Sequence, residues 1–139
     1  MKRFLCLPAL MALTAATAPP VIVETAVSDW SFLPSLSSRG YDHLNLKMMA
    51  KLQEIASQGQ CKLPGGYDRG KLDLRVSFAA QYAPNGALQR IVIPKLNCPE
   101  AESVLGGAVL EMLQGGDYRP TGKNPDGWYQ GDLSFSYGN

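Results

Sequence analysis

The chain has 139 residues, of which 45% are hydrophobic and 18% charged, and its formal net charge at pH 7 is +1. This composition is typical of a globular domain and excludes a chain that is disordered throughout. No run of Lys and Arg is present, which argues against nucleic acid or an anionic membrane surface as the partner, because both require clustered positive charge.

Residues 1–16 have the pattern of a secretory signal peptide. Two basic residues precede an uncharged apolar stretch over residues 4–13, and small residues follow it. We expect cleavage after Ala16 and an exported, periplasmic mature protein. The alternative is an uncleaved membrane anchor, since residues 4–23 carry no charge over about the length of a membrane span. Only in that case would a membrane be a partner.

Residues 17–40 are expected to form an N-terminal tail, because this stretch is rich in Pro and Ser. The tail also has bulky apolar side chains that a free linker would not need, so we expect part of it to pack. These residues are Val21, Ile22, Val23, Trp30, Phe32 and Leu33. The folded domain is expected to cover residues 41–139.

The first helix is predicted near residues 44–55, where apolar residues recur at helical spacing. They are Leu44, Met48, Leu52 and Ile55. Asp42 can cap the start of this helix, and Gly59 can end it.

A β-hairpin is predicted next. Between residues 71 and 80 apolar and polar residues alternate, which is the period of a strand with one buried face. Asn85 and Gly86 then supply the positive φ angles of a tight reversal. The β-branched run at residues 88–93 therefore predicts a second strand, antiparallel to the first.

A second helix and a last strand complete the domain. The apolar face of the helix consists of Ala101, Val104, Leu105, Ala108, Val109 and Met112. Pro99 fits its first turn after an N-cap at Asn97 or Cys98, and two glycines from Gly115 onward stop it. Residues 129–137 alternate again between apolar and polar side chains, which predicts a third strand.

Together these elements predict an α+β domain of order α-β-β-α-β, in which a small three-stranded antiparallel sheet packs against two helices. Cys6 should leave with the leader, so that Cys61 and Cys98 are the two cysteines of an exported chain. The simplest interpretation is one disulfide, which would stabilise the domain by roughly 4 kcal/mol. The alternatives are a metal site or a reactive thiol, but two cysteines and the single His43 are too few for a closed zinc site.

The chain resembles the periplasmic C-terminal domains of TonB and TolA over roughly residues 44–137. One shared feature is the strand, Asn-Gly turn and strand between residues 72 and 93. A second is the Cys-Pro-Glu-Ala sequence from Cys98, which opens a helix followed by the aromatic-x-Pro triplet at Tyr118. A third is the closing strand that ends at Tyr137. TolA-like domains also have a preceding helix and two cysteines in similar places.

This resemblance implies a protein-binding module. It does not support energy transduction by this chain alone. Energy transducers of the family have a membrane anchor with a functional polar residue and a long spacer rich in Pro and charged residues, and neither is visible here. Fully extended, the 25 residues from 17 to 41 would reach only about 85 Å. The implied partner is a periplasmic or outer-membrane protein or peptide.

The C-terminal strand is the candidate binding edge, because a small sheet leaves outer strands whose backbone groups can pair with an extended peptide. The candidate residues are Gln130, Asp132, Ser134, Ser136 and Tyr137. The competing interpretation is that its polar residues are only the solvated face of a terminal strand. Trp128 and Tyr129 could anchor a partner, although aromatic residues beside a strand are more often part of the core.

Nothing in the sequence assembles a catalytic site, a metal site or a cofactor site. His43 lies at a predicted helix start, where a solvated or capping role is expected. Glu100 and Glu102 are two residues apart on a helix and point in different directions, so they serve the helix dipole. We therefore expect a non-catalytic protein. The alternatives are an exported structural or inhibitory subunit and a small secreted enzyme.

Overall fold

The computed structural model describes residues 19–38, 45–122 and 124–138. The predicted signal peptide, the Asp42 cap and His43 lie outside these ranges. In the described part of the chain, no helix is long and apolar enough to cross a membrane.

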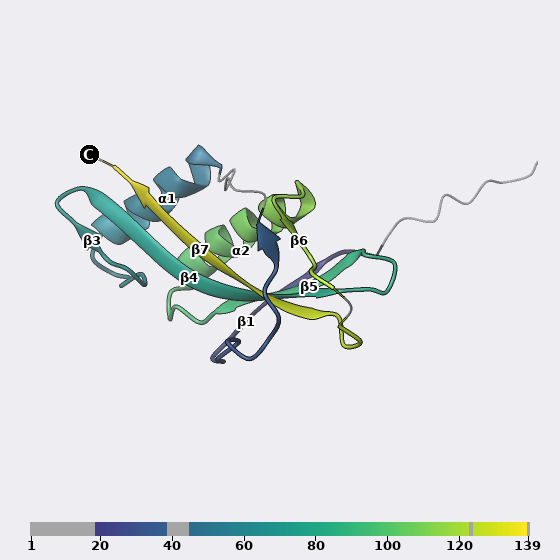
Figure 1. Ribbon diagram of the computed structural model, residues 1–139. Coiled ribbons are helices and arrows are strands. Elements are labelled where there is room, and N and C mark those ends of the chain that lie inside the picture. Colours follow the sequence, from purple (N-terminus) through teal and green to yellow (C-terminus); the bar gives the residue numbers. More distant parts are fainter. Residues whose placement is uncertain (1–18, 39–44, 123, 139) are drawn as a thin grey trace, which may run out of the picture.

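The fold is α+β, with two helices and a mixed five-stranded main sheet. Its strands are β1 (Ile22–Ala26), β3 (Tyr67–Asp68), β4 (Lys71–Tyr82), β5 (Leu88–Pro94) and β7 (Trp128–Tyr137). A second, two-stranded sheet pairs β2 (Ser37–Ser38) with β6 (Tyr118–Arg119). The helices α1 (Leu46–Ser57) and α2 (Pro99–Gln114) lie on one face of the main sheet, and residues 27–38 cross the other face (Figure 1).

The predicted hairpin and last strand form the centre of the main sheet. β4 pairs antiparallel with β5 on one side and with β7 on the other. The β4–β7 register runs from Leu72 opposite Tyr137 to Gln81 opposite Trp128. The alternation along β4 places its even-numbered residues in the core, as the sequence pattern predicts.

The prediction of a three-stranded antiparallel sheet is not confirmed. β1 adds a parallel strand to β5, with Ile22 opposite Arg90 and Ala26 opposite Pro94, and β3 pairs with the start of β4. The physical reason lies at β5, whose outer backbone groups would otherwise have no strand beside them. The β-branched residues before and within β1 favour an extended backbone, so this part of the tail can satisfy that edge.

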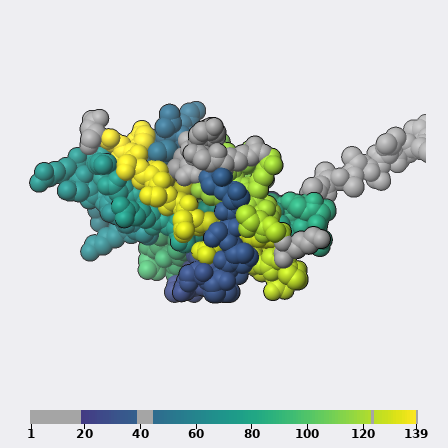
Figure 2. Space-filling model, viewed as in Figure 1, coloured from purple at the N-terminus to yellow at the C-terminus, as the bar shows by residue number. Residues whose placement is uncertain are grey.

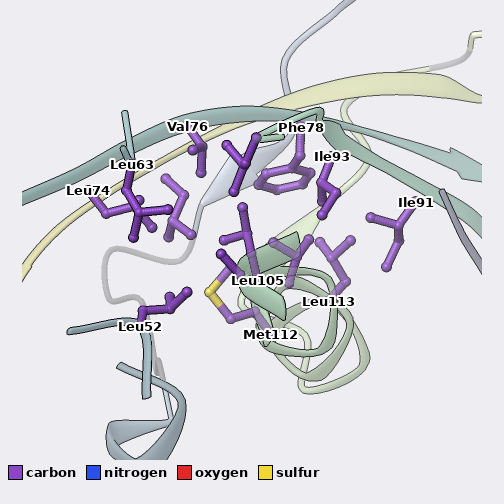
Figure 3. Packing of buried hydrophobic residues seen from close by; sticks show 14 of the residues in the cluster. Leu52, Leu63, Leu74, Val76, Phe78, Ile91, Ile93, Leu105, Met112 and Leu113 are labelled. Atoms are coloured by element: carbon purple, nitrogen blue, oxygen red, sulfur yellow. The ribbon is translucent and has the colours of Figure 1, made fainter. Parts of the chain in front are cut away.

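The core lies between the sheet and the helices. The predicted face of α2 is buried except at Val104, which is only partly buried. Figure 3 shows Leu105 and Met112 of α2 beneath Phe78 and Ile93 of the sheet. α1 buries Met49, Leu52, Ile55 and Ala56. Its N-cap is Asn45, whose side chain accepts a hydrogen bond from the Lys47 amide at 2.9 Å.

Cys61 and Cys98 form a disulfide, as predicted, with their Cα atoms 5.8 Å apart. Cys98 is the N-cap residue of α2, and Cys61 lies in the loop after α1. The bond therefore joins the loop after α1 to the start of α2.

A buried charge on α2 tests this packing. Val109 is fully buried, so Val109→Asp should lower the free energy of unfolding by at least about 3 kcal/mol. Val104→Asp on the same helix is the matched control and should cost about 1 kcal/mol, because this side chain is partly exposed. Urea denaturation measures both. Equal losses for the two variants would mean that α2 does not pack as described.

Removal of the disulfide should destabilise the domain. We expect Cys61→Ala/Cys98→Ala to lower the free energy of unfolding by about 2–4 kcal/mol, because the unfolded chain loses a cross-link over 37 residues. Urea denaturation of the double variant and of wild type with and without reductant measures the loss. A wild-type protein that keeps its stability in reductant and labels two free thiols would contradict the bond.

Candidate functional site

The outer edge of β7 is the predicted binding surface, and the structure shows which of its backbone groups face outward. Gln130 donates its amide to the Pro34 carbonyl at 2.9 Å and accepts at its carbonyl from the Leu36 amide at 2.7 Å. Both groups of Gln130 thus point away from β4. Since backbone direction alternates along a strand, Asp132, Ser134 and Ser136 also direct their N–H and C=O groups outward.

The first part of this edge is already occupied by the chain itself. The segment around Ser35 pairs in parallel with β7 at Gln130. The Gln130 side chain adds two hydrogen bonds from its Nε2, to the Leu33 carbonyl at 2.9 Å and to the Ser31 carbonyl at 3.2 Å. Gln130, one of the predicted binding residues, is therefore closed to an added strand.

Asp132 is partly engaged. Its carbonyl accepts a hydrogen bond from the Tyr118 hydroxyl at 3.2 Å, and its carboxylate accepts one from the Ser77 hydroxyl across β4. The next outward residues are more open. The backbone groups of Ser134 and Ser136 that face outward have no hydrogen-bond partner among the described residues. The open edge thus begins after Asp132 and extends from Ser134 to Ser136.

Side chains along this open edge form two stripes. Ser134 lies opposite Arg75, and the Ser136 hydroxyl donates to the Asp73 carboxylate, so this face is polar and exposed. Phe135 and Tyr137 are half-buried on the other face. Tyr137 directs its backbone inward to Leu72 and could contribute only its side chain to a partner.

β1 forms a second edge that the sequence analysis missed. The Ala26 carbonyl accepts from the Lys95 amide at 3.1 Å, so the alternate residues Val23 and Thr25 direct their backbone outward. A groove of about 430 Å³ separates this edge from α2. A Cβ on Gly106 would lie 2.8 Å from Cγ1 of Val23, so glycine lets the strand approach the helix. The adjacent glycines in the middle of α2 were the signal for this close approach.

The two aromatic residues at the start of β7 have different environments. Tyr129 is buried in the core, and its hydroxyl donates to the Gly122 carbonyl at 3.3 Å and accepts from the Asn124 amide at 3.2 Å. Trp128 is half-buried on the opposite face of the sheet, where it packs with Trp30 and Val92. Tyr129 is therefore a core residue, whereas Trp128 keeps part of its ring at the surface.

Tyr82 has the most strongly perturbed titration of the described groups. Its hydroxyl is buried and has no hydrogen-bond partner among the described residues, and burial raises the pKa of Tyr82 to about 12. It therefore stays neutral at physiological pH. The two glutamates of α2 have structural contacts: Glu102 accepts from the Leu96 amide at 2.8 Å, and Glu100 pairs with Lys51 at 3.4 Å. Among the described residues no cluster of His, Cys, Asp or Glu could hold a metal ion.

Comparison with family models, with curated proteins and with solved structures gives no match. The resemblance to TonB and TolA domains therefore stays a prediction from the sequence motifs. What the protein binds has to be argued from its own surface.

The hydroxyls of Tyr82 and Tyr129 test the energetics of burial at the end of β4 and the start of β7. Tyr82→Phe removes an unpaired buried hydroxyl and should raise the free energy of unfolding by about 1 kcal/mol. Tyr129→Phe, the matched control, removes a paired hydroxyl and should lower it by about 1 kcal/mol. Thermal or urea unfolding at pH 7 measures both. A loss of stability in Tyr82→Phe would mean that this hydroxyl has a partner.

The same variant should also change the pH dependence. The pKa of Tyr82 is about 12 in the folded protein and 10.0 for the unperturbed group, so in this window the folded state keeps a proton that the unfolded state loses. Stability therefore falls as the pH rises from 10 to 12. The fall should be smaller in Tyr82→Phe than in wild type.

Proposed function

We propose that this chain is a non-catalytic, exported protein-binding module that captures an extended protein or peptide segment by strand addition at β7. The observation that carries the proposal is the open edge at Ser134 and Ser136. Their outward N–H and C=O groups lie on the side of β7 away from β4 and have no partner among the described residues. An extended segment can supply those partners with its own backbone.

The length of the open edge limits the affinity. Ser134 and Ser136 offer about four backbone groups, and each hydrogen bond contributes a net of about 0.5–1.5 kcal/mol. Association costs several kcal/mol or more in lost freedom of motion. Strand addition at this site alone therefore supports weak, reversible capture. The same short and polar edge also protects the free protein from pairing with copies of itself.

The two stripes beside the edge define the preferred partner. Alternate side chains of an added strand would lie next to half-buried Phe135 and Tyr137 on one face and next to Ser134 and Ser136 on the other. A segment with alternating apolar and polar residues fits this surface. The acidic and basic groups of Asp73 and Arg75 on the polar face would favour a partner with charged or hydrogen-bonding side chains at its polar positions.

Two further features support the proposal. The order α1, β4, β5, α2 and β7 is the order on which the resemblance to TonB and TolA C-terminal domains rests. The Cys61–Cys98 disulfide is compatible with an oxidising compartment such as the periplasm.

A proline at an outward position tests the binding edge. Ser134→Pro removes an outward N–H, and among the described residues the Ser134 side chain has no hydrogen bond to lose, unlike Ser136 with its bond to Asp73. With a photocrosslinking residue in place of Tyr137, whose side chain faces a partner, Ser134→Pro should fold normally and lose at least about 80% of the crosslinked partner, since one missing donor and a ring obstruct the added strand.

Thr25→Pro is the matched control, because it removes an outward donor from the other edge strand, β1. It should leave the crosslinking yield unchanged. If Ser134→Pro keeps its fold and its full yield, the β7 edge is not the binding surface. Loss of capture in Thr25→Pro alone would assign the partner to the groove between β1 and α2.

A further inference from the structure

The sheet face opposite the helices has a hollow lined by aromatic rings. Residues 27–38 cross this face, and the loop before β7 lies beside them (Figure 2). Between the two segments is a hollow of about 300 Å³, at the lower end of the range for small-molecule sites. Its lining includes Trp30, Phe32, Leu33, Val92, Asp126 and Trp128.

The hollow is held in place by several contacts. Trp30 is buried against Ala79 and Val92 of the sheet. The Leu33 amide donates to the Trp30 carbonyl at 3.0 Å, and Gln130 Nε2 binds the carbonyls on either side of Phe32. These bonds fix the loop, yet the Phe32 side chain is 78% exposed. An apolar ring this exposed on a fixed loop has no role in the packing of the domain.

The described lining of the hollow carries a negative charge. Among the described residues Asp126 has no ion-pair partner, and no Lys or Arg lines the hollow. Asp29, between Ser28 and Trp30, lines a neighbouring pocket that Arg75 also lines, so Asp126 supplies the charge of the hollow. Arg90, two residues from Val92 on the same face of β5, pairs with Glu24 at 3.9 Å.

Aromatic faces and a carboxylate together favour a cation, because the ring quadrupoles attract positive charge and Trp does so most strongly. The number of hydrogen-bond acceptors decides the kind of cation. A primary ammonium has three donors to satisfy. Asn124 Nδ2 donates to the Trp128 carbonyl at 2.6 Å and so occupies that acceptor, and Asp126 is the one charged acceptor among the described lining residues. A quaternary ammonium has no N–H donors, so it gives up no N–H hydrogen bonds to water when the rings displace its hydration shell.

We propose that Trp30, Phe32, Trp128 and Asp126 form a binding site for a quaternary ammonium group on a small ligand of the choline class. The site is separate from the β7 edge and requires no protein partner.

Choline is the probe for this site. Trp30 and Trp128 are the two tryptophans of the chain, so the whole tryptophan fluorescence of the protein reports on this hollow. Titration with choline chloride should give a saturable change, whereas NaCl at the same ionic strength should not. The uncharged isostere 3,3-dimethylbutan-1-ol should bind at least about three-fold more weakly, as loss of a partly exposed cation–π interaction implies.

Substitutions in the hollow locate the binding. Phe32→Ala and Asp126→Asn change exposed side chains, so both variants should keep the wild-type melting temperature, and each should weaken choline about two- to five-fold. Tyr67→Ala, which removes an exposed ring on β3, is the control and should bind choline like wild type.

Several results would overturn the proposal. Equal binding of the uncharged isostere would show that the hollow selects apolar groups and not a cation. Tighter binding of n-butylammonium than of choline would exclude the quaternary class. A choline response that is absent, or that persists unchanged in both hollow variants, would show that this is not its site.

Discussion

The whole main sheet depends on the backbone ladder of β4. β7 follows this twelve-residue strand along nearly its whole length, but β5 pairs only with its last part, from Ala79 to Tyr82. On the β5 side, the loop before β3 bonds two amides of the first part of β4: Asp73 donates to the Gly66 carbonyl at 3.0 Å, and Arg75 donates to the Pro64 carbonyl at 3.0 Å. Gly65, with a φ of +99°, permits this close approach, because a Cβ there would overlap the Asp73 carbonyl.

With β4 paired on both sides, β1 and β7 are the two longer edge strands of the main sheet, and residues 22–38 contribute to both of these edges. This segment begins as β1 on one edge, crosses the sheet face at Trp30 and reaches the other edge at Gln130. Its path decides where the β7 edge starts to be open, and it supplies most of the aromatic hollow. Both candidate surfaces are therefore set by the least regular part of the described chain.

The sequence patterns predicted those helices and strands in which buried and exposed side chains alternate regularly. The alternation at residues 71–80 and 129–137 and the helical spacing of Leu105 and Val109 follow directly from which side chains face the core. The sequence also located the outward residues Ser134 and Ser136. It could not show that Gln130 is occupied, because its partners lie far upstream. β1 was missed as a strand, since five residues with mostly exposed side chains give no alternation of buried and exposed positions.

The open edge and the aromatic hollow share β7 but differ in direction. A strand added at Ser134 would lie in the plane of the sheet, whereas the hollow beside Trp128 opens on its face, so an occupant of one would not block the other. Six residues of strand separate these two positions by about 20 Å. Pairing with β4 along this stretch keeps β7 in one arrangement. Energetic coupling between two sites requires a structural element that can adopt two arrangements. The two surfaces should therefore act independently, unless a single partner is long enough to reach both.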